Sequence, residues 1–435
     1  MSKGKGIKYM KKVAFYTLGC KVNQYETDSM KAIFENGGYG IVDFDGYADV
    51  YVINTCTVTA MGDKKSRQII HLAKNNNKDG VVIVTGCMAQ GIIRDNKTID
   101  GADIIVGNED RKNILNILNE YCGEKIVNVS DIKNEREFWE SNGVISEDRT
   151  RAYIKIQDGC DRYCSYCIIP YVRGPIRSRD FNEVINEAEN MVKDGFSEIV
   201  LIGIHLASYG RDNNGKNLMD VLEELSKIDG IRRIRLGSLE PSFISKENID
   251  RMRRLDKVCK HFHLSLQSGC DTILKRMNRK YTTSEYEEKV YMIREAFPDA
   301  AITTDVIVGF PGETEEEFNK TYDYLKRINL SKMHIFPYSR RTGTPAAKMP
   351  DQVEKSVKKE RADKLIKLSH NNEIAFAKRF LGRKIEVILE NRLKEGYREG
   401  YSEQYVPVLY KGGNAKDVII GVGKKVTDNG EIVIE

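Results

Sequence analysis

Three cysteines lie close together in one short polar segment, residues 159–167. Cys160, Cys164 and Cys167 are spaced four and then three residues apart. A cubane iron–sulfur cluster is normally held by four cysteine thiolates, so three thiolates would leave one iron without a protein ligand. Catalytic metal sites keep such a vacant position for a reactant. The spacing therefore predicts a 4Fe-4S cluster whose open iron takes part in chemistry.

Zinc is the alternative metal for this segment. A zinc site usually needs a fourth Cys or His at a short spacing, and the next histidine along the chain is the distant His205. The sequence therefore favours an iron–sulfur cluster over zinc.

Three further cysteines each end a run of strand-forming residues. The three runs are 13–20, 50–56 and 81–87, and they end in Cys20, Cys56 and Cys87. Such apolar runs, separated by helix-like stretches and followed by a fourth at 104–107, are typical of buried parallel strands in an open α/β sheet. Ligands bind at the carboxyl ends of these strands, so we expect the three thiols to meet at one edge and to hold a second cluster. The alternative is that each cysteine is buried as a small hydrophobic residue.

Farther along the chain, six strand-like runs alternate with amphipathic helical stretches. The runs are 152–156, 198–203, 232–237, 261–266, 301–308 and 332–336. This order predicts a parallel barrel or partial barrel, with its chemistry at the carboxyl ends of the strands. The Cys160 segment follows the first run, where a catalytic loop is expected.

The CxxxCxxC spacing of Cys160, Cys164 and Cys167 resembles the radical S-adenosylmethionine (SAM) superfamily. In that superfamily the open iron binds the amino and carboxylate groups of SAM, and one electron passed to the sulfonium yields a 5′-deoxyadenosyl radical. Tyr166, directly before the last cysteine, matches an aromatic residue that lies near the SAM adenine. The resemblance implies radical chemistry.

The three strand-end cysteines narrow the resemblance to the methylthiotransferases, which carry such a domain ahead of the radical SAM domain. The matching segments are 18–27, 54–59 and 85–87. The first two are most similar to the branch that modifies N6-threonylcarbamoyladenosine in tRNA. Relatives that act on isopentenyl-adenosine tRNA or on a ribosomal protein usually carry other residues after the first and second cysteines.

The resemblance implies that a methylthio group replaces the C2 hydrogen of threonylcarbamoyladenosine, at position 37 beside the anticodon. That C–H bond has no acidity for a general base to exploit, so a radical route is chemically reasonable. The family precedent assigns SAM cleavage to the Cys160 set, and a sulfur species that a second SAM methylates to the Cys20 set. The implied cofactors and partners are two 4Fe-4S clusters, two SAM per turnover, tRNA, a flavodoxin- or ferredoxin-like electron donor and a sulfur source.

Two other functions stay open at this point. A radical SAM enzyme whose N-terminal cluster only relays electrons would form 5′-deoxyadenosine without S-adenosylhomocysteine. A non-catalytic iron–sulfur RNA-binding protein would leave tRNA modification in cells intact after Cys164→Ala.

The resemblance also implies contacts to SAM beyond the cysteines. The expected contact residues are Tyr166, Gly203, Ser238, Glu240, Gln267, Arg279 and Val308. Gly203 stands where the family approaches the SAM amino group, although the acidic residue usual there is replaced. Arg279 could bind the SAM carboxylate or an RNA phosphate in two-point fashion, or it could belong to a solvated helix end.

The C-terminal part of the chain changes its pattern. A charged helix is expected over about 351–379, and short runs at 384–389, 405–410, 418–421 and 431–434 indicate a small antiparallel β-barrel. Its place and size resemble the RNA-binding TRAM domain of the family. Arg392, Lys394, Arg398 and Tyr401 are the expected RNA contacts.

The length and composition set the remaining expectations. A chain of 435 residues should form two or three domains, and we place them at 11–123, 146–376 and 377–435, with a linker at 124–145 in which Trp139 packs on a neighbouring domain or stacks a base. Because no apolar run approaches the ~20 residues of a membrane span, we expect a cytoplasmic protein. The alternation of strand-like runs with helical stretches predicts the α/β class. Nine cysteines then argue for metal or redox chemistry rather than disulfides. Three of them lack ligand-like spacing and are assigned to packing: Cys122, Cys259 and Cys270.

Overall fold

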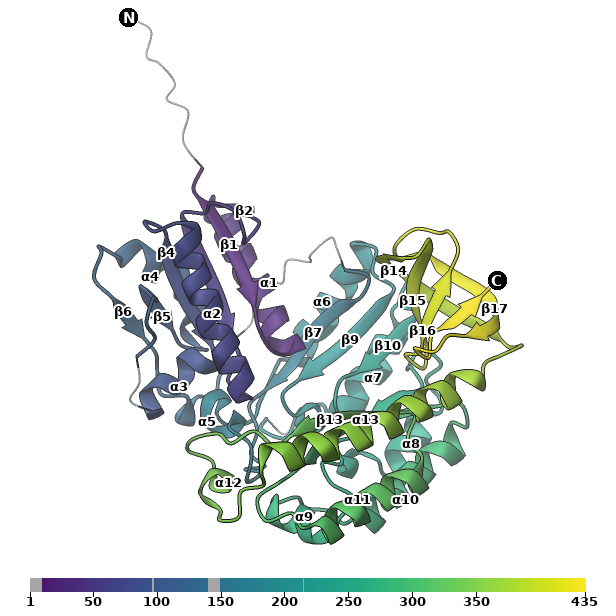
Figure 1. Ribbon diagram of the computed structural model, residues 1–435. Coiled ribbons are helices and arrows are strands. Elements are labelled where there is room, and N and C mark those ends of the chain that lie inside the picture. Colours follow the sequence, from purple (N-terminus) through teal and green to yellow (C-terminus); the bar gives the residue numbers. More distant parts are fainter. Residues whose placement is uncertain (1–9, 96–97, 140–148, 214) are drawn as a thin grey trace, which may run out of the picture.

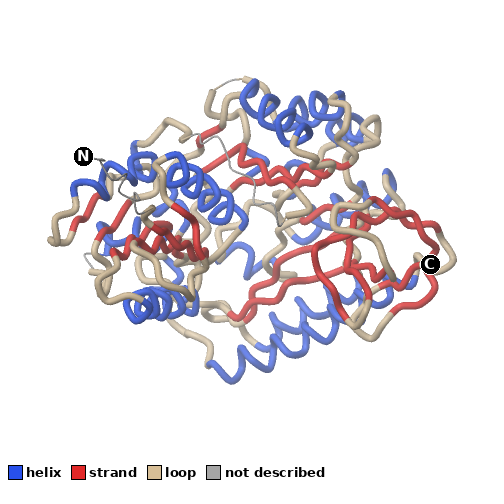
Figure 2. The backbone as a smooth tube through the Cα atoms, turned by 90° about the horizontal axis from the view of Figure 1, so that it is seen from above, coloured by secondary structure: helices blue, strands red, loops and turns tan. Residues whose placement is uncertain are grey.

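The computed structural model describes residues 10–95, 98–139, 149–213 and 215–435. In chain order it contains a parallel sheet flanked by helices, a partial barrel of strands and helices, and a small β-barrel (Figure 1). The N-terminal sheet and the C-terminal barrel lie on opposite sides of the molecule in both ribbon views (Figures 1 and 2). No helix among these residues combines the length and the apolar character needed to span a membrane. The predicted α/β class is confirmed.

The N-terminal sheet has six parallel strands in the order β2-β1-β3-β4-β5-β6. Val13 lies opposite Val50, and Val50 lies opposite Val81, so the apolar runs are in register. Helices cover both faces, which explains why the central strands are apolar throughout rather than alternating. The strands are β1 (Lys12–Thr17), β2 (Gly40–Val42), β3 (Val50–Thr55), β4 (Val81–Gly86), β5 (Ile104–Val106) and β6 (Ile126–Asn128). The helices are α1 (Lys21–Asn36), α2 (Ala60–Asn76), α3 (Cys87–Asp95) and α4 (Ile114–Glu120), with the 3-10 turns η1 (Asp110–Asn113) and η2 (Ile132–Asn134).

The sheet extends into the stretch that the sequence predicted to be a linker. Strand β6 lies within residues 124–145 and pairs in parallel with β5, with Ile104 opposite Ile126. A strand of three residues is too short to show a hydrophobic period, so the polar residues around it dominated the prediction.

The central unit consists of two parallel sheets joined side by side. One has the order β10-β9-β7, with the antiparallel β8 at its edge, and the other has the order β11-β12-β13. A bridge between Leu239 and Leu264 connects them. The strands are β7 (Ala152–Asp158), β8 (Arg177–Ser178), β9 (Glu198–Gly203), β10 (Arg233–Leu236), β11 (His261–His263), β12 (Ala301–Val308) and β13 (Lys332–Pro337). The helices are α5 (Ile169–Arg173), α6 (Phe181–Lys193), α7 (Leu218–Lys227), α8 (Lys246–Met252), α9 (Asp271–Arg276), α10 (Thr283–Ala296), α11 (Glu315–Ile328), α12 (Pro345–Lys348) and α13 (Lys355–Lys378), with the 3-10 turns η3 (Leu206–Ser208) and η4 (Pro241–Phe243).

Helix α1 packs on both the N-terminal sheet and the inner face of the partial barrel. Met30 and Phe34 belong to the core beneath the N-terminal sheet. Val22, the second residue of the helix, packs with Val200 and Ile202 of β9. The residues that follow Cys20 therefore tie the N-terminal unit to the barrel.

The C-terminal strands close into a barrel in the order β14-β15-β16-β18-β17. All pairs are antiparallel except β16 with β18, which are parallel. The sequence analysis missed β15, whose polar residues show no clear alternation; Gly400 lets it approach β14, since a Cβ there would overlap Val387. The strands are β14 (Lys384–Lys394), β15 (Tyr397–Ser402), β16 (Pro407–Tyr410), β17 (Val418–Val426) and β18 (Ile432–Ile434).

Candidate active site

Cys20, Cys56 and Cys87 follow three neighbouring strands of the N-terminal sheet, β1, β3 and β4. The Cys20 loop packs directly on Cys56, because a Cβ added at Gly19 would lie 3.1 Å from the Cys56 sulfur. Burial raises the pKa of the Cys87 thiol to about 11, and Cys56 and Cys20 are close enough to contribute to that rise. The structure thus brings the three thiols to one edge of the sheet.

Asn23 holds the loops that carry two of these cysteines. Its Nδ2 donates hydrogen bonds to the carbonyl oxygens of Leu18, at 2.8 Å, and Thr55, at 3.0 Å. Its Oδ1 lies 3.8 Å from the Cys20 sulfur. The side chain is 1% exposed, so these bonds are shielded from competing water.

The second cysteine set lies in the loop after β7. The Cys160 amide donates to the carbonyl of Gly174, and the Cys167 amide donates to the carbonyl of Cys164, at 2.9 Å. Burial raises the pKa of Cys160 to about 11 and that of Cys167 to about 12, and the neighbouring Cys164 contributes to both. The three thiols therefore share one small region.

Gly159 lets the chain turn from β7 into this loop. Its φ is +71°, and a Cβ there would overlap the carbonyl oxygen of Pro175. Gly159→Ala should therefore lower the free energy of unfolding by about 3 kcal/mol. The matched control is Gly195→Ala, at φ +85° with open space around it, which should cost about 1 kcal/mol. Urea denaturation would measure both, and equal losses would contradict the steric argument.

Among the predicted SAM contacts, Glu240 lies beside three basic side chains. Its carboxylate lies 2.5 Å from His205 Nε2, 2.7 Å from Arg162 Nε and 3.5 Å from Arg279 Nη2. Burial alone would raise the pKa of this carboxyl, but His205, Arg279 and Arg162 lower it below its usual value. Arg279 also lies 3.2 Å from the Cys164 sulfur through Nη1. Glu240 and Arg279 therefore adjoin the Cys160 loop.

The other predicted contacts have different surroundings. Tyr166 is half-buried, and Arg279, Cys164 and Cys167 are near its hydroxyl. Gly203 ends β9 and faces Gln157, whose side chain a Cβ would meet at 3.0 Å. Ser238 is exposed, and Gln267 has a φ of +75° beside β12. Val308 is fully buried at the end of β12, so only its backbone can face a ligand.

Sequence reasoning missed Arg173, the last residue of α5. Its side chain is 0% exposed, its Nε lies 3.4 Å from the Cys87 sulfur, and its Nη2 donates to Asn23 Oδ1 at 2.6 Å. Its Nη1 donates to Asp158, at 3.2 Å, and to Glu26. Arg173 therefore contacts one cysteine set while standing six residues after Cys167. The available indication was the charge of Arg173 itself, which directly follows the apolar stretch 168–172.

Glu26 of α1 is at the centre of the buried ion network that contains Arg173. Its carboxylate pairs with Arg111 at 2.5 Å, with Lys155 at 2.9 Å and with Arg173. Burial would raise the pKa of this carboxyl, but the three cations lower it well below its usual range. Asp158, directly before Gly159, accepts from Lys155 at 2.5 Å. One network thus joins the loops of both cysteine sets.

Aromatic residues cover this network. The Trp139 ring centroid lies 5.4 Å from the Arg111 guanidinium, and the Phe138 ring lies 5.2 Å from Lys155 Nζ. Of the two roles predicted for Trp139, packing on a neighbouring domain agrees with this contact. Cys259 and Cys270 are buried as predicted, but the packing role of Cys122 is wrong, because Cys122 is exposed just after α4.

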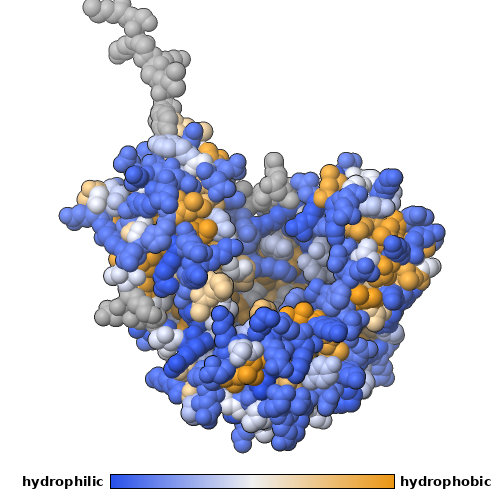
Figure 3. Space-filling model, in the orientation of Figure 1, coloured by the Kyte–Doolittle hydropathy of each residue, from blue (hydrophilic) through white to orange (hydrophobic). Residues whose placement is uncertain are grey.

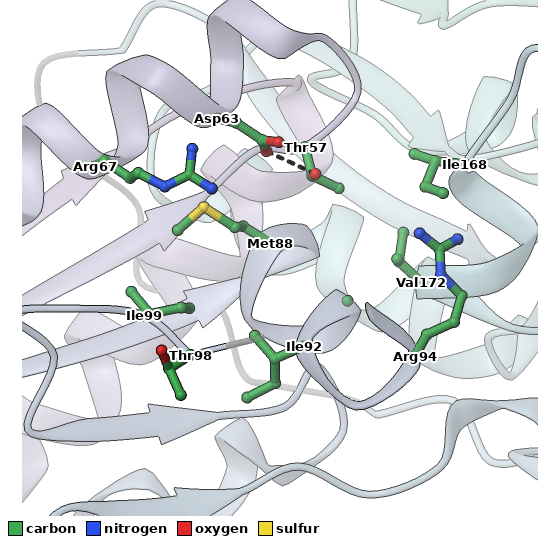
Figure 4. Close-up of a pocket in the computed structure, with 11 residues that line it drawn as sticks. Thr57, Asp63, Arg67, Met88, Ile92, Arg94, Thr98, Ile99, Ile168 and Val172 are labelled. Carbon is green, nitrogen blue, oxygen red and sulfur yellow. Dashed lines mark hydrogen bonds between the residues drawn. The ribbon is translucent and has the colours of Figure 1, made fainter. Parts of the chain in front are cut away.

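A small pocket adjoins both cysteine-bearing regions (Figure 4). Thr57, Met88 and Ile168, which directly follow Cys56, Cys87 and Cys167, all line it. Its full lining is Thr57, Asp63, Arg67, Met88, Gly91, Ile92, Arg94, Thr98, Ile99, Ile168 and Val172. Thr57 donates to Asp63 at 2.7 Å, and Arg341 from the barrel reaches Asp63 at 2.7 Å. The pocket lies where the N-terminal unit meets the barrel.

The chemistry of the two donor sets fits iron–sulfur clusters. Within the described residues, no three His, Cys, Asp or Glu side chains surround a point that a single metal ion could occupy. A cluster spreads its ligands over several irons, and each set here offers only thiols, the donors that such clusters take.

Two family models match the chain. The radical SAM superfamily matches residues 154–325, and a family described as uncharacterized protein family UPF0004 matches residues 12–107. The chain is 47% identical over 410 residues to threonylcarbamoyladenosine tRNA methylthiotransferase MtaB of Bacillus subtilis (strain 168), covering 93% of this chain and 91% of that protein. The chain belongs to the radical SAM methylthiotransferase family. The methylthiotransferase of the same description from Aquifex aeolicus is 45% identical, with 90% and 98% covered.

A further relative of this chain is more distant, and a solved structure resembles it in fold. A tRNA-2-methylthio-N(6)-dimethylallyladenosine synthase of Acetivibrio thermocellus is 37% identical, with 86% of this chain and 79% of that protein covered. Among solved structures, the radical SAM methyltransferase TsrM of Kitasatospora setae superposes with a TM-score of 0.56 at 14% identity, covering 90% and 81% of the chains. That likeness concerns the fold alone.

Proposed function

We propose that this protein is a tRNA methylthiotransferase that converts N6-threonylcarbamoyladenosine at position 37 into its 2-methylthio derivative. One observation carries the proposal: two sets of three thiols, joined by the Glu26 and Arg173 network, occur in a chain 47% identical to a protein named for that reaction. The identity to the named dimethylallyladenosine synthase is lower, at 37%.

Cys160, Cys164 and Cys167 would hold one 4Fe-4S cluster, and Cys20, Cys56 and Cys87 would hold a second. When bound, the first supplies the electron that cleaves SAM, and the second offers a coordination position for sulfur. The residues proposed to contact SAM remain Tyr166, Gly203, Ser238, Glu240, Gln267, Arg279 and Val308. Two SAM molecules would be used in each turnover.

The described side chains would bind SAM and hold the two cysteine loops in place. Glu240 is an acceptor for the SAM amino group, and Arg279 can bind the SAM carboxylate while its Nη1 remains near the Cys164 sulfur. The contact of Val22 with the inner face of β9 keeps the N-terminal unit against the barrel. Arg173, buried between the two cysteine sets, holds their loops at a constant separation.

The tRNA would lie in the hollow between the N-terminal unit and the C-terminal barrel (Figure 3). Of the proposed RNA contacts in the TRAM-like unit, 377–435, Arg392 is exposed and lies 3.5 Å from Glu399, and Lys394 pairs with Glu431 at 2.5 Å. Arg398 donates to the carbonyl of Gly413, and Tyr401 stacks on Tyr405. The proposal includes a cytoplasmic location, a flavodoxin- or ferredoxin-like electron donor and a sulfur source.

Mass spectrometry of tRNA nucleosides tests this function. Cells that lack the protein should lose the methylthio form of threonylcarbamoyladenosine and accumulate threonylcarbamoyladenosine without the methylthio group. The wild-type chain should restore the methylthio form. The Cys164→Ala chain should not restore the methylthio form, because one cysteine ligand of the SAM-cleaving cluster is then missing. Restoration by Cys164→Ala would support a non-catalytic RNA-binding role. In anaerobic assays with tRNA, 5′-deoxyadenosine without S-adenosylhomocysteine would indicate electron relay alone.

A further inference from the structure

Several cations lie on and near β7, and most of them are paired with carboxylates. Arg149 pairs with Asp28 at 2.6 Å, Lys155 pairs with Glu26 at 2.9 Å, and Arg151 pairs with Glu390. Arg235 of β10 pairs with Glu198 at 2.7 Å. The charges of these side chains are therefore balanced by carboxylates within the fold.

Lys21, the first residue of α1, differs from this group. Within the described parts of the chain its ammonium makes no ion pair or hydrogen bond. Its Nζ lies 5.7 Å from the centroid of the Tyr153 ring, and Glu198 and the cations Arg151 and Arg235 act on it from farther away. The side chain is exposed, although the next residue, Val22, is buried against β9. Lys21 therefore presents an ammonium with no direct counterion among the described residues, at the place where α1 meets the barrel.

Lys21 directly follows Cys20, so its side chain starts beside the proposed sulfur site and extends toward Tyr153 of β7. On an adenine ring, C2 and the carbon that bears N6 are both bonded to N1. A nucleoside whose C2 is delivered to the Cys20, Cys56 and Cys87 edge must therefore keep its N6 substituent close to that edge. In threonylcarbamoyladenosine this substituent ends in a carboxylate, whereas the dimethylallyl substituent is apolar.

We propose that the Lys21 ammonium binds the threonine carboxylate of the substrate nucleoside and so helps to select this nucleoside over those with an apolar N6 group. The inference rests on the proposed function. A carboxylate that leaves water for a protein cleft needs a charged donor, and an ammonium supplies three N–H groups. Arg235 is a weaker candidate, since its guanidinium also donates to the carbonyls of Glu403 and Ser402.

The test uses reconstituted full-length protein and two anticodon stem–loop RNAs. One carries threonylcarbamoyladenosine, and the other carries the same nucleoside with its carboxylate converted to a methylamide. For the first RNA, Lys21→Met should reduce kcat/KM and weaken binding roughly 10- to 100-fold, as expected for a hydrogen bond to a charged group. For the methylamide RNA the change should be less than about threefold, and Lys21→Arg should retain most of the wild-type affinity. Lys359→Met, on the exposed face of α13, is the charge-matched control.

Two readouts separate a binding role from a structural one. Iron content and the 5′-deoxyadenosine formed without RNA should be the same in Lys21→Met and wild type. Loss of iron in the variant, or equal losses with the two RNAs, would overturn the inference while leaving the proposed function in place. If the wild-type protein modifies neither RNA, the proposed function fails and the inference fails with it.

Discussion

Replacing Cys20, Cys56 and Cys87 together by alanine should halve the iron bound by the reconstituted protein, from about eight to about four atoms per chain. The reason is that these three thiols form one of two separate donor sets, at the ends of neighbouring strands β1, β3 and β4. The variant should still form 5′-deoxyadenosine from SAM, because the Cys160 loop is intact. It should add no methylthio group to tRNA.

Two matched variants complete this experiment. Alanine at Cys160, Cys164 and Cys167 should also leave about four irons per chain, but it should abolish SAM cleavage. Alanine at Cys122, Cys259 and Cys270 should leave about eight, since these cysteines lie outside both sets. A wild-type chain that saturates at about four irons would show that the strand-end thiols hold no cluster.

Glu26→Ala should lower the free energy of unfolding by about 3–5 kcal/mol, the cost of removing one partner from a buried ion pair. The carboxylate is 1% exposed and is the shared partner of Arg111, Arg173 and Lys155. Its loss leaves three buried cations, and among the described residues Asp158 still pairs with Lys155 and Arg173 but not with Arg111. Urea denaturation of the metal-free chain would measure the effect without interference from cluster loss.

The control for this prediction is Glu360→Ala on α13. Glu360 pairs with Lys364 at 2.9 Å, but both side chains are exposed, so its loss should change stability by less than about 1 kcal/mol. Equal effects of the two substitutions would contradict the role of the buried network.

Stability should also depend on pH through Glu26. Folding lowers the pKa of this carboxyl well below its usual range, so the stability it contributes is fully present above the pKa of the unfolded chain, about 4. That contribution is lost as the pH falls toward the folded pKa. Glu26→Gln, which cannot ionise, should therefore lose less stability than wild type between about pH 5 and pH 3.

Much of the fold could be predicted from local pattern. Strands β9 and β12 begin and end at the predicted residues, and β3 and β4 end one residue before Cys56 and Cys87, where the predicted runs end. These strands are rich in β-branched residues, so they stand out against the helices between them. Strands β6 and β15 were missed because they are short or polar, and pairing with a neighbouring strand stabilises them more than their own residues do.

The sequence by itself determined the two cysteine sets and the α/β class. One set stands in a single short loop, the other stands at the ends of apolar runs, and these runs alternate with helical stretches. Only the tertiary structure decided how the two sets are connected. Arg173 and Asn23 are 150 residues apart, and Lys155 and Glu26 are 129 apart, yet they meet in one buried network. A charged residue looks the same in a sequence whether it is solvated, as most are, or buried and paired. Burial, which depends on contacts across the whole chain, distinguishes Arg173 from a surface arginine. Only the folded contacts show that the Lys21 ammonium makes no ion pair with the described residues.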